Sequence, residues 1–379
     1  FFAIQHEVFM EHLYEKLQVI ESDRHPLSNM ERLKAITGPL LSWYDDHARS
    51  LPWRDQPDPY RVWVSEIMLQ QTRVEAVKPY FNRFMEVFPD VKALAEADEE
   101  RLLKMWEGLG YYNRAKNLQK SAKVIVESYD GRLPGSYEEL LKLPGIGSYT
   151  AGAIASIAFG VPVPAVDGNV LRVISRVLAS EEDILKASVK KKTEDDLRKI
   201  MPHHRVSAFN QGLIEIGAIV CVPNGPPRCH LCPLASLCLT RRFKSWDSIP
   251  VKSPKKPRRI EKRTILLLET DKHQIAIEKR PDSGLLASLY QFPNLEGSFD
   301  EAQLWRLLTS RGAEIKSIES AGTARHIFSH VEWQMNGYRI FLKGDIPAPY
   351  LSADVSQLRT KYPLPNAFGA YIKLLSGES

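Results

Sequence analysis

Apolar residues recur at every third or fourth position from Leu27 to about Phe243, which is the period of amphipathic helices. In the segment Val64–Phe88 the apolar residues fall mostly on one stripe, and Glu66 lies off that stripe near the start of the expected helix. No hairpin signal interrupts the pattern, and the expected helices stop at glycines such as Gly108, Gly131 and Gly160. This part of the chain is therefore predicted to be all-α.

The pattern changes after Trp246, where proline, serine, lysine and arginine predominate up to Arg263. Such a composition predicts an extended connection between two domains. We place this connection at residues 244–263, between an all-α domain over 27–243 and a second domain over 264–379.

Beyond the connection, the apolar positions predict short strands and one helix. Strands are expected at Arg263–Glu269, at His273–Glu278 and at Val331–Leu342 around Asn336-Gly337, and the helix at Asp300–Leu308. The second half is therefore predicted to be α+β, and the whole protein multidomain.

Length and composition limit the class of protein. The chain has 379 residues, 44% of them hydrophobic and 26% charged, which fits two or three globular domains. A disulfide-stapled mini-protein, a collagen-like chain and a wholly disordered chain are excluded. No stretch approaches the roughly 20 apolar residues of a membrane span, and Phe1–Arg24 shows no cleavable-signal pattern. We therefore expect a cytoplasmic protein without membrane association.

The net charge of +5 is unevenly distributed. Between Lys252 and Arg263 one acid, Glu261, stands among seven basic residues: Lys252, Lys255, Lys256, Arg258, Arg259, Lys262 and Arg263. Such a run is either a solvated linker or a strap that faces a polyphosphate, in which case binding is sensitive to salt.

All four cysteines of the chain fall within one window of 18 residues; they are Cys221, Cys229, Cys232 and Cys238. Disulfides spread through a secreted fold do not cluster in this way, whereas four thiolates that bind one inorganic centre must. Both a tetrahedral zinc ion and an iron–sulfur cluster accept four thiolates.

A Gly-x-Gly turn, Gly145 to Gly147, separates a helix that ends near Lys142 from an alanine-rich helix. Two glycines let the backbone approach an anion, and the helix N-terminus that follows adds a favourable dipole. The alternative is a turn that only connects two helices and binds no ligand. About twenty residues later, Asp167 precedes another helix, where it is either an N-cap or a functional carboxylate.

The order of these features, a Gly-x-Gly turn, an aspartate and a four-cysteine window, resembles the helix-hairpin-helix superfamily of base-excision DNA glycosylases. Three further segments resemble the adenine DNA glycosylase family, which removes adenine mispaired with 8-oxoguanine or guanine: Leu51–Arg54, Val64–Val74 and Gly108–Ala115. The resemblance runs from about Leu27 to Leu239, with a looser match beyond.

Tyr149 stands where bifunctional members of the superfamily, by resemblance, have a lysine whose amine forms a Schiff base with the sugar. A phenol cannot form an imine. The resemblance therefore implies a monofunctional glycosylase, in which water hydrolyses the N-glycosidic bond without strong strand cleavage.

The residue types fit this chemistry. Adenine leaves readily only when N7 or N3 is protonated, so a protonated carboxylic acid is needed, and Glu66 is the candidate. Asp167, ionised, is the candidate that stabilises the oxocarbenium-like sugar. By resemblance, Tyr149 supports the site by hydrogen bonding and Asn169 orients water or Asp167. The alternatives are an exposed helix carboxylate for Glu66 and simple packing for Tyr149.

The enzyme must extrude its base, so the resemblance also assigns DNA contacts. By resemblance, Gln71 and Tyr111 intercalate, Thr72 and Leu109 contact the 8-oxoguanine side, and the Gly145–Gly147 turn holds phosphate. The residues that line the adenine pocket by the same resemblance are Trp53, Arg54 and Gln211. An amide can read the edge of adenine; the alternative for Gln211 is an ordinary polar helix position.

By the same resemblance, the loop 221–238 carries a structural [4Fe–4S] cluster rather than zinc. Its first spacing is seven residues where the family has six, and a loop rich in proline and glycine can absorb the difference. The basic residues of the loop are expected to face DNA; they are Arg228, Arg241 and Arg242. His230 lies between two ligands and is expected to face solvent.

The second half resembles the Nudix-like recognition domain of the same family. Gly284–Pro293 occupies the place of a Nudix segment, although Leu289–Gln291 departs from the usual Trp-Glu. The glutamate-rich, metal-binding helix is missing, since Asp300–Arg311 offers only Glu301. We therefore expect a reader without hydrolase activity. The loop Phe328-Ser329-His330 resembles the 8-oxoguanine sensor, with a polar loop between strands as the alternative.

We thus expect a monomer that binds double-stranded DNA containing A:8-oxoguanine or A:G mispairs, nucleoid-associated if bacterial. One rival is a thymine or uracil mismatch glycosylase on the same scaffold. The other is a catalytically silent iron–sulfur or zinc DNA-binding protein, in which Glu66 and Asp167 are an ordinary helix residue and a cap.

Overall fold

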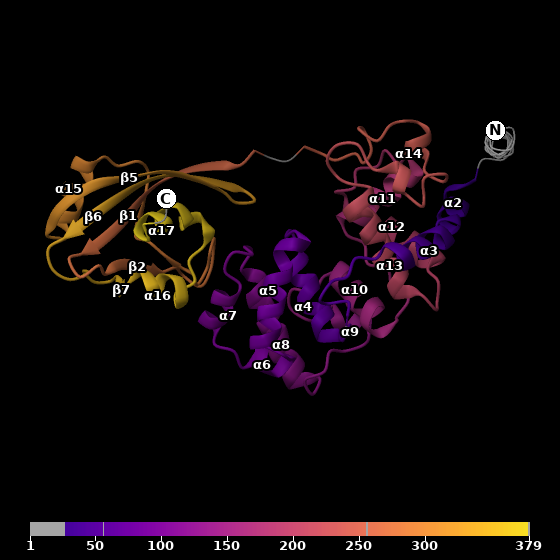
Figure 1. Cartoon of the computed structure of the whole chain (residues 1–379), viewed down its shortest axis with the longest axis horizontal. Helices are drawn as coiled ribbons and strands as arrows, with labels where there is room; N and C mark the ends of the chain where they lie inside the picture. Colours follow the sequence, from indigo (N-terminus) through magenta and orange to yellow (C-terminus); the bar gives the residue numbers. More distant parts are fainter. Residues whose placement is uncertain (1–26, 56, 255–256, 378–379) are drawn as a thin grey trace, which may run out of the picture. The chain divides into compact units, whose positions relative to one another are not determined.

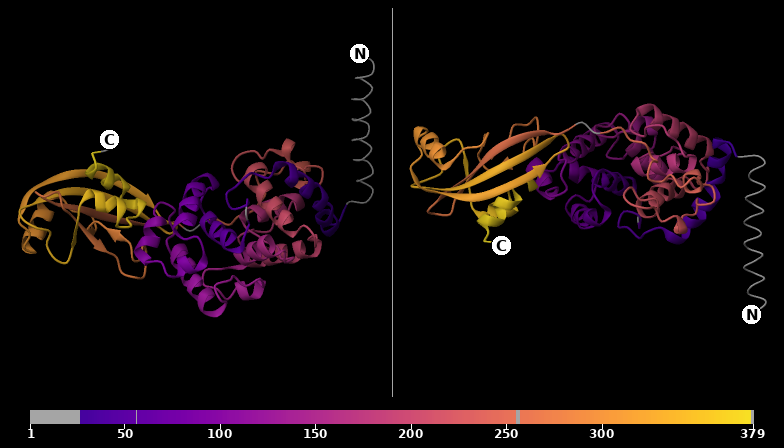
Figure 2. Two further views of the ribbon diagram at one scale, coloured as in Figure 1. Left: turned by 60° about the horizontal axis from the view of Figure 1, so that its bottom comes forward. Right: turned by 90° about the horizontal axis from the view of Figure 1, so that it is seen from above.

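The structure is a computed structural model that describes residues 27–55, 57–254 and 257–377. The segment Phe1–Arg24, where no signal pattern is expected, lies outside the described residues, as do Lys255 and Lys256 of the basic run. Figures 1 and 2 show the elements along the chain. Among the described residues, no helix combines the length and the apolar character that crossing a membrane requires.

The chain divides into two compact units, and each is described by itself. The first unit holds Pro134–Ser253 and the segment up to Trp63. The second holds Val64–Leu133 and the segment from Pro254 onward. The predicted domain limits, which follow the sequence without interruption, stay a prediction.

The first unit contains helices and no strand among its described residues, as predicted. Its helices are α2 (Asn29–Ala35), α3 (Thr37–His47), α9 (Tyr137–Leu140), α10 (Ser148–Phe159), α11 (Gly168–Leu178), α12 (Ala187–Ile200), α13 (Val206–Glu215), the π-helix η1 (Ile216–Val220), the short 3-10 helix η2 (Cys229–Leu231) and α14 (Leu239–Arg242). The helix α4 (Pro59–Leu69) begins in this unit and ends in the second.

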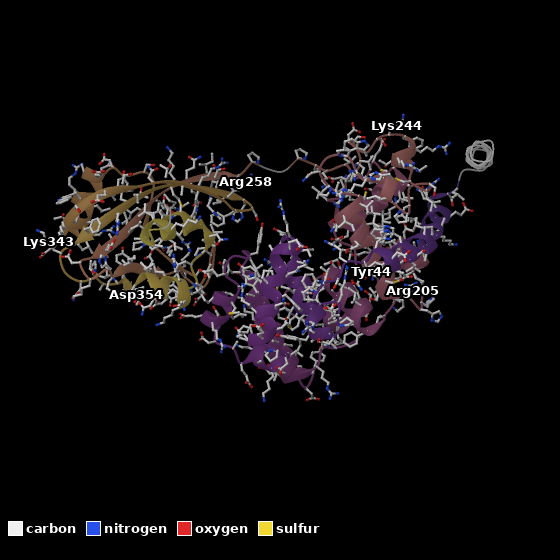
Figure 3. The ribbon with its side chains drawn as sticks, in the orientation of Figure 1. Tyr44, Arg205, Lys244, Arg258, Lys343 and Asp354 are labelled. Carbon is white, nitrogen blue, oxygen red and sulfur yellow. The ribbon has the colours of Figure 1, made fainter. Side chains whose placement is uncertain are left out.

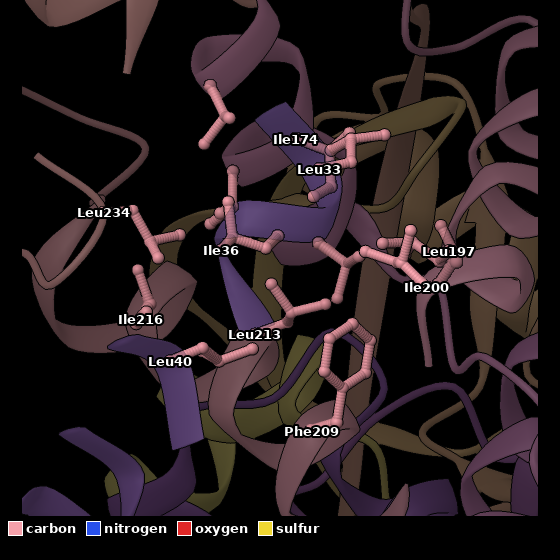
Figure 4. Close-up of a cluster of buried hydrophobic side chains, with 14 of the residues drawn as sticks. Leu33, Ile36, Leu40, Ile174, Leu197, Ile200, Phe209, Leu213, Ile216 and Leu234 are labelled. Carbon is pink, nitrogen blue, oxygen red and sulfur yellow. The ribbon is translucent and has the colours of Figure 1, made fainter. Parts of the chain in front are cut away.

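Side chains from helices far apart in sequence form the core of the first unit. Figure 4 shows them meeting: α2 contributes Leu33, α3 contributes Leu40, and Ile36 lies between these two helices. Later helices contribute Ile174, Leu197, Ile200, Phe209, Leu213 and Ile216. Burial of this apolar surface is the main force that holds the helices together. At the start of α2, Ser28 and Glu31 form a capping box that satisfies free backbone N–H groups.

The helical part of the second unit corrects two predictions: Glu66 lies near the end of α4 rather than near a helix start, and the expected helix is divided. The segment Val64–Phe88 is not one helix: α4 ends at Leu69, and α5 (Val74–Val87) begins after a break. Within the break, the φ of Gln71 is 58°, outside the range of a right-handed helix. The helices α6 (Val91–Ala95), α7 (Glu99–Met105) and α8 (Asn113–Ser128) follow.

The rest of the second unit is built on a seven-stranded sheet in the order β3-β2-β1-β6-β5, with β4 paired to β1 and β7 paired to β2. The strands are β1 (Arg259–Thr270), β2 (Ile275–Lys279), β3 (Tyr290–Gln291), β4 (Asn294–Glu296), β5 (Ile315–Ile327), β6 (Val331–Leu342) and β7 (Leu351–Ala353). The pair β1–β6 is parallel and the other pairs are antiparallel.

The sequence predicted β1 too short and missed β5, as well as the short strands β3, β4 and β7. The strand predicted from Arg263 begins four residues earlier, at Arg259, because Arg259 already pairs with Val331 of β6. The end of the basic run is thus strand rather than linker. The strand β5 was not predicted, because its apolar residues do not alternate regularly with its polar ones. The strand β6 continues through Asn336 and Gly337 as expected.

Helices cover both faces of this sheet. Alternate residues of β1 point to opposite faces, and each set packs on different helices. Leu266 and Leu268 pack on α15 (Glu301–Ser310), where a helix was predicted. Ile265 and Leu267 face α16 (Val355–Thr360), the 3-10 helix η3 (Asn366–Phe368) and α17 (Gly369–Leu375). The second half is therefore α+β, as predicted.

Candidate active site and nucleic-acid interface

Asp167 is the N-cap of α11, in the first unit. Its Oδ1 accepts hydrogen bonds from the backbone N–H groups of Asn169 and Val170, both at 2.8 Å, and its Oδ2 accepts one from Asn169 Nδ2 at 2.7 Å. The carboxylate is therefore held in one orientation at the positive end of the helix. Asp167 is thus an N-cap, one of the two roles considered for it, and an N-cap carboxylate can also have a functional role.

Burial raises the pKa of Asp167 above its ordinary value, although three hydrogen bonds and the Arg172 charge oppose the shift. The carboxyl is therefore withdrawn from water, while its negative form is supported by every neighbouring donor. Such a group can present a poorly solvated anion to a developing positive charge.

Asn169 links Asp167 to the loop that carries the cysteines. Its Oδ1 accepts a hydrogen bond from Arg172 Nη2 at 2.8 Å, and the same nitrogen donates to the Gly217 carbonyl oxygen at 2.7 Å. Arg172 Nε donates to the carbonyl oxygen of Cys221 at 2.8 Å. A continuous chain of hydrogen bonds thus joins the first cysteine to the candidate catalytic carboxylate.

The helix η1 packs directly on Asn169. A Cβ added to Gly217 would lie 2.5 Å from the Cβ of Asn169, closer than side-chain atoms approach one another. The glycine therefore allows η1 to lie close enough for its carbonyl to accept from Arg172. Neither this glycine nor Arg172 stands in a motif that marks it in the sequence.

The Gly-x-Gly turn precedes α10 as predicted. Gly145 has a φ of 76°, which favours glycine, whereas Gly147 is the N-cap of α10 with an extended conformation. Ser148 follows, and its hydroxyl accepts from Lys190 Nζ at 2.8 Å. A cation therefore lies beside the N-terminus of α10. Tyr149, the second residue of α10, is half-buried.

The three residues assigned to the adenine pocket have different surroundings in the first unit. Trp53 is buried. Arg54 Nη2 lies 2.9 Å from Oε2 of Glu215, a fully buried carboxylate that also binds Arg49. Gln211 is half-buried in α13 and donates from Nε2 to the Ser207 hydroxyl at 3.0 Å. Arg54 thus already serves a buried ion pair, which the sequence analysis missed.

The four cysteines are free thiols that line one cavity of about 220 Å³; they are Cys221, Cys229, Cys232 and Cys238. Arg176 Nη1 lies 3.3 Å from Sγ of Cys221. Burial raises the pKa of Cys232 to about 12. Among the described residues, no three or more His, Cys, Asp or Glu side chains form a group fit for a single metal ion. His230 is exposed, as predicted.

Two arginines connect this loop to α11. Arg172 and Arg176 stand one turn apart and are both buried in the helix Gly168–Leu178. Arg176 donates to the carbonyl oxygens of Val222, Trp246 and Ile249 at 2.8–3.1 Å. Two arginines four residues apart in a helix rich in valine, leucine and isoleucine were the sequence signal that could have identified them.

In the second unit, Glu66 lies in α4 with only 8% of its surface exposed. The alternative interpretation, an exposed helix carboxylate, is therefore wrong. A glutamate this far withdrawn from water in a helix is unusual without a partner or a function.

Four of the residues assigned to DNA contacts lie on two turns of the second unit. Gln71 and Tyr111 are exposed, whereas Leu109 is buried and Thr72 is half-buried. Arg114, which the sequence analysis missed, donates to backbone carbonyls of both turns. Burial lowers the pKa of Arg114 to about 10, so that the guanidinium stays charged at neutral pH.

The loop Phe328-Ser329-His330 joins β5 to β6. The ring of Phe328 packs edge-on against Trp333, with centroids 5.0 Å apart, so this residue anchors the loop to the core. Ser329 and His330 are exposed, and Ser329 Oγ lies 3.2 Å from the Tyr111 hydroxyl. Arg258, labelled in Figure 3, donates to the Phe328 carbonyl oxygen at 3.2 Å.

Known proteins resemble both halves of the chain. Residues 64–203 match the HhH-GPD superfamily of base excision DNA repair proteins, and residues 264–374 match the NUDIX domain. The chain is 36% identical over 316 residues to the adenine DNA glycosylase of Buchnera aphidicola subsp. Acyrthosiphon pisum (strain APS), an alignment that covers 83% of this chain and 87% of that relative.

A second relative is the adenine DNA glycosylase of Homo sapiens, 34% identical over 394 residues, which covers 87% of this chain and 71% of the relative. Among solved structures, Endonuclease III in a non-covalent complex with DNA aligns with a TM-score of 0.50 and 27% identity. That alignment covers 57% of this chain and 98% of the other.

Proposed function

The chain belongs to the adenine DNA glycosylase family of the HhH-GPD superfamily, and from this we propose that it hydrolyses the N-glycosidic bond of adenine mispaired with 8-oxoguanine or guanine in double-stranded DNA. Membership makes it a DNA glycosylase of base excision repair, a hydrolase. The observation that carries the mechanism is the Asp167 carboxylate, held by three hydrogen bonds at the start of α11.

Glu66 supplies the proton. The leaving adenine would otherwise carry away negative charge on its ring, and protonation at N7 or N3 removes that cost. The burial of Glu66 supports this role, because water does not compete for the carboxyl proton. The proton of Glu66 moves to the base, and the bond between the base and the sugar breaks with its electron pair on the base.

Asp167 stabilises the positive sugar that remains. Its anion is oriented by Asn169 and by two backbone N–H groups before the charge develops, so that no reorganisation is needed during the step. Water then adds to the sugar carbon and gives up a proton, which the Glu66 carboxylate can take back. Tyr149 carries no amine, so no Schiff base forms and the strand stays intact at the abasic site.

Extrusion of the adenine precedes this chemistry. Gln71 and Tyr111 fill the space that the base leaves, and their exposure on two turns supports this role. Ser329 and His330, exposed at the tip of the β5–β6 hairpin, read the altered edge of 8-oxoguanine. The contact between Ser329 and Tyr111 supports a common position for the two groups on the duplex.

We also propose that the four cysteines hold a [4Fe–4S] cluster. The observation that supports this proposal is that all four thiols line one cavity, and four thiolates are the ligand set of such a cluster. When bound, the cluster would supply iron–thiolate bonds that order the loop. The preparation should then absorb at about 400 nm, where zinc thiolates are colourless. A colourless protein that contains zinc after anaerobic purification would contradict the cluster.

Single-turnover base release tests the function. The substrates are duplexes with adenine opposite 8-oxoguanine, adenine opposite guanine and thymine opposite guanine, each with and without alkaline treatment. We expect adenine release, fastest opposite 8-oxoguanine, with strand breaks only after alkali. Release of thymine would favour a thymine mismatch glycosylase. Strand breaks without alkali would contradict the role of Tyr149. No release of either base would favour a catalytically silent DNA-binding protein.

A further inference from the structure

Two exposed side chains in the second unit stand on a backbone conformation that few residues adopt. Gln71 follows the end of α4 with a φ of 58°, and Tyr111 precedes α8 with a φ of 49°. Tyr111 is 49% exposed. A residue with a Cβ is less stable in this left-handed region, so the surrounding structure must hold both turns.

Arg114, in the first turn of α8, holds the turn at Gln71. Its Nη1 donates to the carbonyl oxygens of Ile67, Met68 and Gln70 at 2.8, 2.9 and 2.6 Å. In a helix that continued beyond Leu69, these carbonyls would accept from backbone N–H groups one turn later. The guanidinium therefore takes the place of the missing turn.

The other terminal nitrogen of the same side chain holds the turn at Tyr111. Arg114 Nη2 donates to the carbonyl oxygens of Leu109 and Gly110, both at 3.0 Å. The guanidinium also lies 5.7 Å from the ring centre of Tyr111. One side chain thus binds both turns at once.

These hydrogen bonds lie at the peptide groups that set the direction of the two exposed side chains. The carbonyl of Gln70 belongs to the peptide group that enters Gln71, and the carbonyl of Gly110 belongs to the one that enters Tyr111. A bond to each carbonyl fixes the plane of that peptide group, and with it the direction in which the next side chain leaves the backbone. The planar fork of arginine presents a separate nitrogen to each turn, whereas a lysine ammonium donates from a single nitrogen.

We propose that Arg114 is a positioning residue that holds Gln71 and Tyr111 as one rigid wedge, and that it acts on extrusion of the adenine through them. The second part rests on the proposed function. Without Arg114, both turns would relax independently of each other, and the two side chains would no longer enter the duplex together.

Backbone amide exchange, measured on the whole chain without DNA, tests the first part. It does not require the protein to be active. In Arg114→Met, peptides that cover residues 67–73 and 108–113 should both exchange about tenfold faster than in the parent, while those of α5 do not change. Arg114→Lys, which keeps the charge and loses the fork, should loosen at least one of the two segments. Unchanged exchange of both segments in both variants would overturn the proposal.

Single-turnover release of adenine opposite 8-oxoguanine tests the second part. Arg114→Met should slow release about 100-fold, as expected for a displaced recognition group. In a Gln71→Ala, Tyr111→Ala background the same substitution should slow release by less than about threefold, since the wedge is already absent. A full additional loss in that background would overturn the proposed route.

The matched control is Arg101→Met, in α7 of the same unit, where the guanidinium lies over Phe88 rather than against the two turns. It should leave exchange of both turns and the rate of release unchanged, and a similar effect from it would overturn the assignment to Arg114. If the parent itself releases no adenine, the proposed function fails, whereas amide exchange still decides whether Arg114 holds the turns.

Discussion

The protonation of Asp167 sets a pH limit on base release. Burial raises the pKa of this carboxyl above its ordinary value, and the proposed mechanism needs the ionised form. As the pH falls through the raised pKa, the anion is lost and the rate should drop. The acid limb of the single-turnover rate should therefore lie above about pH 4, the ordinary value for aspartate. A rate that stays constant down to that pH would contradict the ionised role.

Glu215 sustains the first unit through a buried charge cluster. Burial alone would raise its pKa, but the hydrogen bond from Arg49 and the charge of Arg54 outweigh burial and hold the pKa below its usual value. The stabilisation is therefore present above about pH 4.3, the unfolded value, and is lost as the pH falls through the lower pKa of the folded state.

Glu215→Gln should lower the free energy of unfolding by about 3–5 kcal/mol at neutral pH, because two arginines lose their buried partner. Urea denaturation followed by circular dichroism measures the change. The control is Asp45→Asn, which breaks an exposed pair with Arg205 and should cost far less. Equal losses in the two variants would contradict the importance of burial.

The residues proposed to carry chemistry stand out in the sequence more clearly than the residues that hold them. Glu66, Asp167 and Tyr149 were found because they stand in motifs. Arg114 and Arg172 bond mainly to backbone carbonyls, and a carbonyl leaves no mark in the sequence, so such arginines resemble ordinary helix residues.

Contact between η1 and α11 positions Asn169. Gly217→Ala adds a Cβ that would lie 2.5 Å from the Cβ of Asn169, and relief of this clash must move one helix or the other. We expect slower adenine release, by about 100-fold if Asn169 shifts by an ångström, and a loss of about 1–3 kcal/mol in stability. Single-turnover kinetics and urea denaturation measure both effects.

Gly38→Ala is the control for this substitution. Gly38 lies in α3 of the same unit, and a Cβ there meets no atom within 4 Å. Alanine should therefore leave the rate unchanged and stabilise the helix slightly. A rate for Gly217→Ala equal to that of the parent would contradict the positioning of Asn169 by η1.

Elements whose limits depend on the local apolar pattern were predicted. Elements whose limits depend on a contact with a distant segment were missed. The helix near Asp300 and the core of β1 follow from their apolar spacing. The break after Leu69 depends on Arg114, which is distant in sequence. The extension of β1 to Arg259 depends on β6, which supplies the bonds to charged residues that carry no strand pattern of their own.

Within the second unit, the helix α7 is attached to the sheet half through Lys104. Its Nζ donates to the carbonyl oxygens of Leu358 and Tyr362 at 3.1 and 3.0 Å, and Glu107 accepts from the Leu364 N–H at 2.8 Å. A pattern of apolar residues cannot predict such docking, because charged side chains bond to backbone. The sequence therefore predicted the two folds and not their attachment.

Lys104→Met should weaken this attachment and lower the preference for adenine opposite 8-oxoguanine over adenine opposite guanine by about tenfold, since two charged hydrogen bonds are lost. The ratio of the two single-turnover rates measures it. Lys92→Met, at an exposed lysine of α6, should leave the ratio unchanged. An unchanged ratio in Lys104→Met would mean that lesion preference does not depend on this contact.

For the whole molecule, the central claim is that Glu66 donates a proton while ionised Asp167 stabilises the positive sugar. Single-turnover adenine release by Glu66→Gln and Asp167→Asn tests this claim most directly. Each variant should slow release opposite 8-oxoguanine by about 1,000-fold or more while binding the same duplex with an affinity close to that of the parent. Release at the parental rate by either variant, with the duplex bound equally well, would contradict the role assigned to that carboxylate.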